Sequence, residues 1–190
     1  MNKIIIQNIN ESIKTKEKLK KQAKKIEKIS NLILNALDND GKIFFFGNGG
    51  SAGDAQHIAA ELVGKFQKKR KGLSAIALTT NTSILTAIGN DFGFDFIFER
   101  QVESLVKPND IVVGISTSGN SENVIKGIKV AKKIGAITIG LTGSKKNKLE
   151  KISDFILKIP STNTQRIQEA HIMIGHIICE IIENKISKSK

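Results

Sequence analysis

The 190-residue sequence contains no tryptophan, no tyrosine, only two prolines and a single cysteine. An internal disulfide is therefore excluded, and because Cys179 falls in an apolar helical stretch we expect a buried structural thiol. No run of apolar residues approaches the length of a membrane span. The apolar triplet at residues 4–6 gives way at once to polar Gln7, which is too early for a signal peptide. These absences predict a cytoplasmic protein with no membrane partner.

The charge is one-sided, with 30 Lys and Arg against 18 Asp and Glu and a net charge of +12. A basic protein can bind nucleic acid, an anionic membrane face or anionic metabolites. The sequence has no Trp or Tyr to stack on bases, and no Phe lies among the N-terminal lysines. A solvated lysine-rich surface is favoured over a nucleic-acid site, and the charge can also attract a phosphorylated substrate. Two clusters carry much of the excess: Lys14, Lys16, Lys18, Lys20, Lys21, Lys24, Lys25 and Lys28, then Lys68, Lys69, Arg70 and Lys71.

The N-terminal 40 residues are dominated by a helical pattern. Apolar residues recur every three or four positions, which predicts one face of a long first helix. They are Leu19, Ala23, Ile26, Ile29, Ile33 and Leu37. The chain length fits one domain over residues 1–190, and we expect segment 1–40 to pack on this domain or on a neighbouring subunit.

Short apolar runs alternate with helical patterns along the rest of the chain. The runs predict strands at 43–46, 75–78, 111–115, 136–141 and 155–159. The main helices are expected from the glycine-rich loop to about Lys65, from Ser121 to Ile134 before Gly135, and from 165 to 185. This alternation predicts an α/β fold, a doubly wound five-stranded parallel sheet flanked by helices. One stretch is ambiguous, because the phenylalanines at 92, 94, 96 and 98 alternate like a strand while residues 99–106 are typical of a helix.

Two loops at the expected carboxyl edge of the sheet have unusual compositions. Residues 116–121 (STSGNS) place four hydroxyls before a helix, where free N–H groups and partial positive charge favour a phosphate. The alternative for Ser121 is that it only caps the helix. Residues 47–51 (GNGGS) match neither the dinucleotide nor the nucleotide-triphosphate glycine pattern. That second loop indicates only a tight turn or a close approach of backbone to a ligand.

All three histidines lie on two predicted helices. His57 and Glu61 are four residues apart and share a helix face, and the last helix carries Gln168, His171 and His176. His57 and Glu61 are explained equally well as an exposed helix pair, and His171 as a structural residue. In their position after the glycine-rich loop, imidazole and carboxylate also suit a zinc site, and a carboxylate beside a polarised carbonyl suits proton abstraction from carbon.

Five segments together resemble the sugar isomerase (SIS) domain family, and within it the phosphoheptose isomerases. These segments are FGNGGS at 46–51, DAQHIAAEL at 54–62, GNDFGF at 89–94, ISTSGNSENV at 115–124 and RIQEAHI at 166–172. The serine loop alone marks only the broader family. The resemblance implies an aldose–ketose isomerase that converts D-sedoheptulose 7-phosphate to D-glycero-D-manno-heptose 7-phosphate through an enediol(ate), an early step toward lipopolysaccharide heptose.

The resemblance also implies one Zn²⁺ per site and a homotetramer with active sites at subunit contacts. It makes Glu61 and His176 the acid/base pair. It makes His57, Glu61, Gln168 and His176 the metal ligands. The implied substrate contacts are Asn48, Gly49, Gly50, Ser51, Glu61, Asn90, Asp91, Ser116, Thr117, Ser118, Ser121 and Gln168.

Some features qualify these expectations. Gln168 and His176 are eight residues apart, which on a straight helix separates them by roughly 12 Å of rise, so shared ligands between subunits are favoured. Residues 145–149 lack glycines often found there in the family, and neither they nor residues 161–165 receive a role. The rival interpretation is a non-catalytic SIS-type regulator that binds the bacterial replication initiator. As the resemblance goes, such regulators lack the glutamate and the late histidine, whereas Glu61 and His176 are both present here.

Overall fold

The computed structural model describes residues 1–187, and its centre is one parallel β-sheet. The strand order is β2-β1-β3-β4-β5, and every neighbouring pair is parallel. The strands are β1 (Ile43–Gly47), β2 (Ala75–Ala77), β3 (Ile111–Ile115), β4 (Ile137–Thr142) and β5 (Phe155–Lys158). This confirms the predicted doubly wound fold. The strand order reverses between β1 and β3, where such sheets bind ligands beyond the carboxyl ends of the strands.

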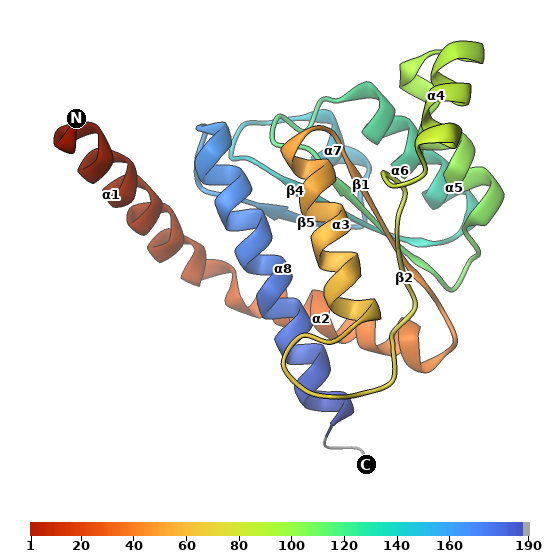
Figure 1. Cartoon of the computed structure of the whole chain (residues 1–190), viewed down its shortest axis with the longest axis horizontal. Coiled ribbons are helices and arrows are strands. Elements are labelled where there is room, and N and C mark those ends of the chain that lie inside the picture. Colours follow the sequence, from red (N-terminus) through yellow and green to blue (C-terminus); the bar gives the residue numbers. More distant parts are fainter. Residues whose placement is uncertain (188–190) are drawn as a thin grey trace.

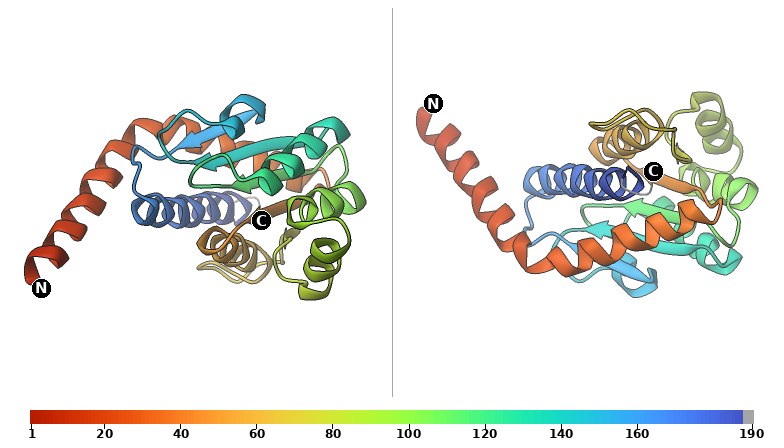
Figure 2. Two further views of the ribbon diagram at one scale, coloured as in Figure 1. Left: turned by 90° about the horizontal axis from the view of Figure 1, so that it is seen from above. Right: turned by 90° about the horizontal axis from the view of Figure 1, so that it is seen from below.

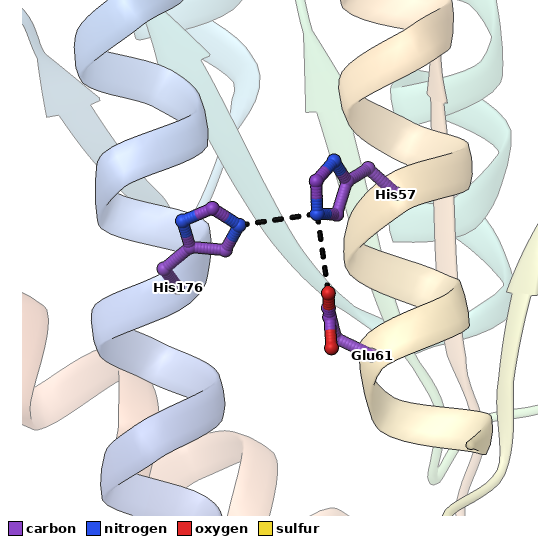
Figure 3. Close-up of side chains that lie close together, drawn as sticks. All are labelled: His57, Glu61 and His176. Atoms are coloured by element: carbon purple, nitrogen blue, oxygen red, sulfur yellow. Dashed lines mark hydrogen bonds and ion pairs between the residues drawn. The ribbon is translucent and has the colours of Figure 1, made fainter. Parts of the chain in front are cut away.

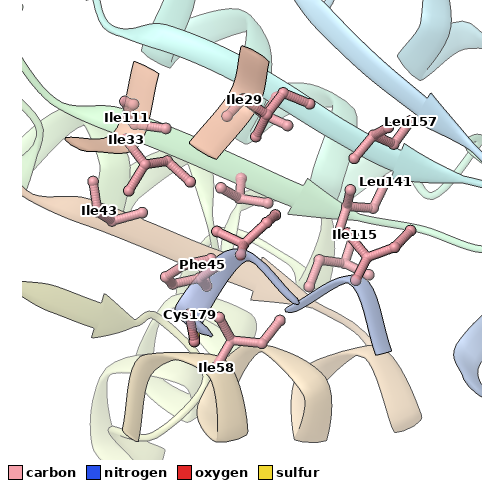
Figure 4. Packing of buried hydrophobic residues seen from close by; sticks show 14 of the residues in the cluster. Ile29, Ile33, Ile43, Phe45, Ile58, Ile111, Ile115, Leu141, Leu157 and Cys179 are labelled. Atoms are coloured by element: carbon pink, nitrogen blue, oxygen red, sulfur yellow. The ribbon is translucent and has the colours of Figure 1, made fainter. Parts of the chain in front are cut away.

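Helices cover both faces of the sheet, as Figure 1 shows. One apolar cluster joins the sheet to α2, α3 and α8, and Figure 4 shows Ile29, Ile58 and Cys179 from these helices meeting strand residues. A second cluster joins the opposite face to α5, α6 and α7. The helices are α1 (Asn2–Leu19), α2 (Ala23–Asp38), α3 (Gly50–Val63), α4 (Thr82–Asp91), α5 (Glu99–Leu105), α6 (Glu122–Ile134), α7 (Lys148–Ile152) and α8 (Thr164–Ile186).

The predicted long N-terminal helix is present over residues 2–38 and is divided by a 3₁₀ turn into α1 and α2. A short 3₁₀ turn (Lys20–Gln22) joins α1 to α2, and Ala23 beyond it is exposed, so the predicted apolar face is interrupted there. Helix α2 lies on the sheet, whereas α1 extends away from the body (Figures 1 and 2). Helix α1 contacts the start of α8, where Ser12 Oγ donates to Glu169 Oε2 at 2.7 Å and Arg166 Nη1 donates to Asn8 O at 2.7 Å.

The ambiguous phenylalanine stretch forms no strand. Residues Phe94–Phe96 make a 3₁₀ turn and α5 follows, which confirms the helical alternative for the residues after it. Phe98 is buried and stacks on Phe46 with ring centroids 4.8 Å apart, whereas Phe94 is 64% exposed. The alternation therefore did not mark a face of a sheet.

The predicted thiol environment is confirmed, since Cys179 is buried in the core and burial raises its pKa to about 12. None of the helices within residues 1–187 combines the length and the apolarity that crossing a bilayer requires.

Candidate active site

The glycine-rich loop and the serine loop lie side by side at the carboxyl edge of the sheet. Gly47 ends β1 opposite Ile115, which ends β3. Just beyond, the side-chain amides of Asn48 and Asn123 exchange two hydrogen bonds of 2.9 Å. This reciprocal pair ties the first loop to the start of α6. Gly49 has φ +55°, a left-handed conformation that favours glycine at this turn.

Gln168 reaches the same loop from α8. A Cβ placed on Gly50 would lie 2.4 Å from Gln168 Nε2, so the amide occupies the space that a side chain at this position would need. Glycine at position 50 therefore lets α8 bring a polar group to the N-terminus of α3.

The serine loop forms a compact cluster of hydroxyls. Ser116 Oγ lies 3.0 Å from Ser121 Oγ and 3.4 Å from Ser118 Oγ. Ser121 is the N-cap residue of α6, but its side chain makes no capping hydrogen bond. The capping alternative therefore does not account for this hydroxyl, which faces its neighbours in the loop. Such a cluster at a helix N-terminus suits an anionic oxygen ligand.

His57, Glu61 and His176 converge on one point from two helices, as Figure 3 shows. His57 Nε2 lies 3.2 Å from Glu61 Oε1 and 3.1 Å from His176 Nε2. The side chain of His57 is 48% exposed and that of Glu61 24% exposed, so a small molecule can reach them. The pair at positions 57 and 61 is thus part of a three-residue cluster.

Close packing of α3 against α8 brings His176 to the pair. A Cβ on Gly175 would lie 2.6 Å from Ile58 Cδ1, so glycine at 175 allows the two helices to approach where their site residues are attached. The Phe66 ring lies 5.7 Å from the His176 ring between centroids and limits where the imidazole can turn.

The three side chains fit a zinc ion in donor type and spacing. Zn–N and Zn–O bonds of about 2.0–2.1 Å in a tetrahedral site separate neighbouring ligand atoms by roughly 3.3 Å. The separations from His57 Nε2 are 3.1 and 3.2 Å, and all three ligand atoms lie within 4.8 Å of one another. Two imidazoles and a carboxylate suit zinc better than Mg²⁺, which prefers oxygen ligands.

All three residues belong to one chain. The spacing argument for ligands from different subunits concerned Gln168 and His176. His176 joins His57 and Glu61 within this chain, whereas the amide of Gln168 lies against Gly50.

Asp54 is a further acidic group near the cluster, one helical turn before His57. Its Oδ2 is buried and has no hydrogen-bond partner among the described residues. Burial raises the pKa of Asp54 to about 6, and the charge of nearby His57 partly offsets this. The segment around it carries the family resemblance, but burial of the carboxyl could not be inferred from sequence.

Arg70 corrects an expectation. The run at 68–71 predicted a solvated cationic surface, yet the Arg70 side chain is only 4% exposed and its Nε lies 3.1 Å from buried Glu183 Oε1. Arg70 Nη2 also donates to the carbonyl oxygen of Glu61 at 2.7 Å. Backbone N–H groups of residues 66–68 donate to the Glu183 carboxylate as well. This ion pair anchors the loop that follows α3 and carries Phe66.

Three of the remaining polar residues lie outside this convergence. Asn90 and Asp91 end α4, a helix with no buried residue, and their side chains hydrogen-bond to each other at 2.8 Å. Within residues 1–187 no hydrogen bond joins them to either loop. His171 is fully buried, and burial lowers its pKa to about 4. It is therefore a neutral core residue.

Comparison with known proteins places this architecture in a family. A family model described as the SIS domain matches residues 7–143. The phosphoheptose isomerase of Aquifex aeolicus is 56% identical over 86% of both chains, and that of Clostridium acetobutylicum is 50% identical over 100% of this chain and 98% of its own. The chain belongs to the phosphoheptose isomerases of the SIS domain family.

A solved structure of the same family agrees with this assignment. The phosphoheptose isomerase of Neisseria gonorrhoeae superposes with a TM-score of 0.92 at 44% identity, covering 96% of this chain and 98% of that one. Phosphoheptose isomerases are aldose–ketose isomerases. The expected enzyme class and the family membership indicated by the five sequence segments are therefore confirmed.

Proposed function

We propose that this SIS-domain protein converts D-sedoheptulose 7-phosphate to D-glycero-D-manno-heptose 7-phosphate. The observation that carries the proposal is the meeting of Glu61 with His57 and His176 in a chain whose close relatives are named phosphoheptose isomerase. The regulator alternative is not favoured, because this chain has both the glutamate and the late histidine and its relatives carry the enzyme's name.

Glu61 is the base in this mechanism. Isomerisation removes a proton from C1 of the ketose and returns one at C2, which requires a carboxylate within hydrogen-bond reach of both carbons. Glu61 Oε1 faces His57, and Oε2 makes no hydrogen bond within the described part of the chain. One oxygen can therefore be held in place while the other exchanges the proton.

His176 has two possible uses for the same nitrogen. Its Nε2 faces the cluster and serves either as a ligand or as the group that moves a proton between O1 and O2. A His176 that binds an ion through Nε2 has only Nδ1 left to exchange a proton. A Zn²⁺ ion held by His57, Glu61, His176 and, in the proposed full set, Gln168 would polarise the substrate oxygens and stabilise the enediolate charge.

The serine loop binds the phosphate end in this proposal. Hydrogen-bond donors for the phosphate come from the hydroxyls of Ser116, Ser118 and Ser121 and from the N–H groups at the start of α6. These groups take no part in the proton transfer. Binding energy gained at the phosphate positions the distant reacting carbons. Substrate contacts of Asn48, Gly49, Gly50, Ser51, Asn90, Asp91, Thr117 and Gln168 complete the proposed set.

The product and setting follow the same proposal. A heptose phosphate suits lipopolysaccharide precursor synthesis, and the cytoplasm with its reducing conditions is the proposed location. A single-domain organisation of residues 1–190 is likewise proposed.

Purified protein incubated with Zn²⁺ and sedoheptulose 7-phosphate should accumulate the aldose product. Product can be separated from the ketose by anion-exchange chromatography and identified by its anomeric NMR signals. In deuterated water, label should enter C2 of the aldose to the extent that the proton held by the base exchanges with solvent before it is returned. Protein that contains zinc and is folded but leaves the ketose unchanged would contradict the proposed function.

We also propose that the protein is a homo-oligomer, with a tetramer as the expected form. Helix α1 presents exposed isoleucines and extends away from the body (Figure 2), so a second copy can cover this stripe. The exposed residues are Ile4, Ile5, Ile6, Ile9 and Ile13.

Light scattering at micromolar concentration should give a mass several times 20.7 kDa. Ile9→Asp combined with Ile13→Asp should lower this mass, since two charges on the stripe oppose its burial. The control Lys14→Asp combined with Lys18→Asp, on exposed positions of the same helix, should leave it unchanged. A parent mass equal to one chain would refute the proposal.

A further inference from the structure

Beside the serine loop lies a polar hollow of about 350 Å³, to whose lysines the reaction scheme assigns no role. Its walls are the loops that follow β3, β4 and β5, together with the start of α8. Ser118 belongs both to this hollow and to the hydroxyl cluster around Ser116. The hollow is therefore adjacent to the proposed phosphate site.

The loop after β4 is fixed against the serine loop. Gly143 N donates to Thr117 O and Leu149 N donates to Gly119 O, each at 3.0 Å. A Cβ on Gly143 would lie 2.8 Å from Thr117 O, so glycine allows this approach. These two backbone hydrogen bonds hold both ends of segment 144–148 against the serine loop.

Asn147 fixes the middle of the same loop. Its buried amide donates to Lys145 O at 2.8 Å, and its carbonyl oxygen accepts from Glu150 N at 2.9 Å. The side chain packs against Gly119, where a Cβ would lie 2.2 Å from Asn147 Cγ. The backbone that carries Lys145 and Lys146 therefore has a defined position at the hollow.

Lys145 and Lys146 both line the hollow, and they are its charged residues. No carboxylate lines it, and neither lysine forms an ion pair within residues 1–187. Two nearby lysines do form ion pairs: the Lys148 ammonium lies 3.3 Å from the Glu122 carboxylate, and the Lys158 ammonium lies 2.7 Å from that of Glu150. Two uncompensated positive charges thus stand beside a wall of Ser and Thr hydroxyls, a combination that suits a phosphate.

We propose that Lys145 and Lys146 form a cationic rim that binds the phosphate group of the substrate and sets its affinity. The inference rests on the proposed function and assigns a role to the loop that follows β4. The lysines act on binding and not on the proton transfer at the other end of the sugar.

The test is the double variant Lys145→Gln with Lys146→Gln. An exposed charge pair contributes up to about 1 kcal/mol, so losing two should raise KM about five- to thirtyfold while kcat stays within about twofold. Added salt should raise the KM of the parent more steeply than that of the variant. The matched control, Lys129→Gln with Lys133→Gln, removes the same charge from exposed positions toward the end of α6, outside the hollow, and should leave KM near the parent value.

Inorganic phosphate gives a second readout that needs no turnover. It should inhibit the parent competitively, and calorimetric titration should show weaker phosphate binding to the Lys145 and Lys146 variant. An unchanged KM, an unchanged phosphate affinity, or inhibition that is non-competitive would overturn the inference. A parent that binds phosphate through these lysines yet converts no heptose phosphate would defeat the proposed function and leave the anion site standing.

Discussion

Glu61→Gln should lower kcat by about 10²–10⁴-fold with sedoheptulose 7-phosphate as substrate, because it removes the base and keeps the shape of the side chain. The fold should survive, since glutamine is a good helix former and the side chain is partly exposed on α3. The rate should be measured under saturating substrate, and far-UV circular dichroism should confirm the native helix content.

The same variant must be separated from a loss of metal, because Glu61 is also a proposed ligand. Zinc content measured beside the rate resolves this: retained metal with lost turnover supports the base, and loss of both supports the ligand role alone. Glu180→Gln, an exposed carboxylate one turn beyond His176 on α8, is the control and should keep the parent rate. A Glu61→Gln enzyme as fast as the parent would refute the mechanism.

The strands and the long helices were predictable because their buried residues form continuous apolar runs in strands and recur every three or four positions in helices. Strand β3 spans the predicted Ile111–Ile115, and α6 ends as expected at Ile134, followed by Gly135 with φ +96°. Helix α4 was not predicted, because it is only 10 residues long and none of its residues is buried, although Leu85 and Ile88 pack partly buried against the core. Its sequence signal is the cap, where Asn81 Oδ1 accepts a hydrogen bond from Ile84 N.

The site was predictable where its residues share one helix and not where it depends on packing. The spacing of His57 and Glu61 places them on one face of α3, but the approach of His176 requires α8 to pack closely at Gly175. No local pattern encodes that distance, and only the family resemblance pointed to His176. For Arg70 the prediction was wrong. The run of positive charges at 68–71 predicted an exposed side chain, but Arg70 forms a buried ion pair with Glu183.

Removal of metal should lower kcat about a hundredfold or more, and Zn²⁺ should restore it. A bound ion that stabilises the enediolate charge contributes several kcal/mol, and each 1.36 kcal/mol is a tenfold change in rate. The protein should be treated with a chelator, dialysed, and titrated with metal while zinc content is measured by mass spectrometry. Full recovery should require about one ion per chain.

Two comparisons make this prediction specific to the cluster in Figure 3. Mg²⁺ should not restore activity, because two imidazole ligands favour zinc over a hard cation. His57→Ala should weaken zinc binding in a calorimetric titration, since His57 Nε2 is the atom that lies within 3.2 Å of both Glu61 and His176. The measurement is independent of turnover, so a defect in catalysis alone cannot imitate it. If metal-free protein turns over at the parent rate, or if His57→Ala binds zinc as tightly as the parent, the three side chains do not form a metal site.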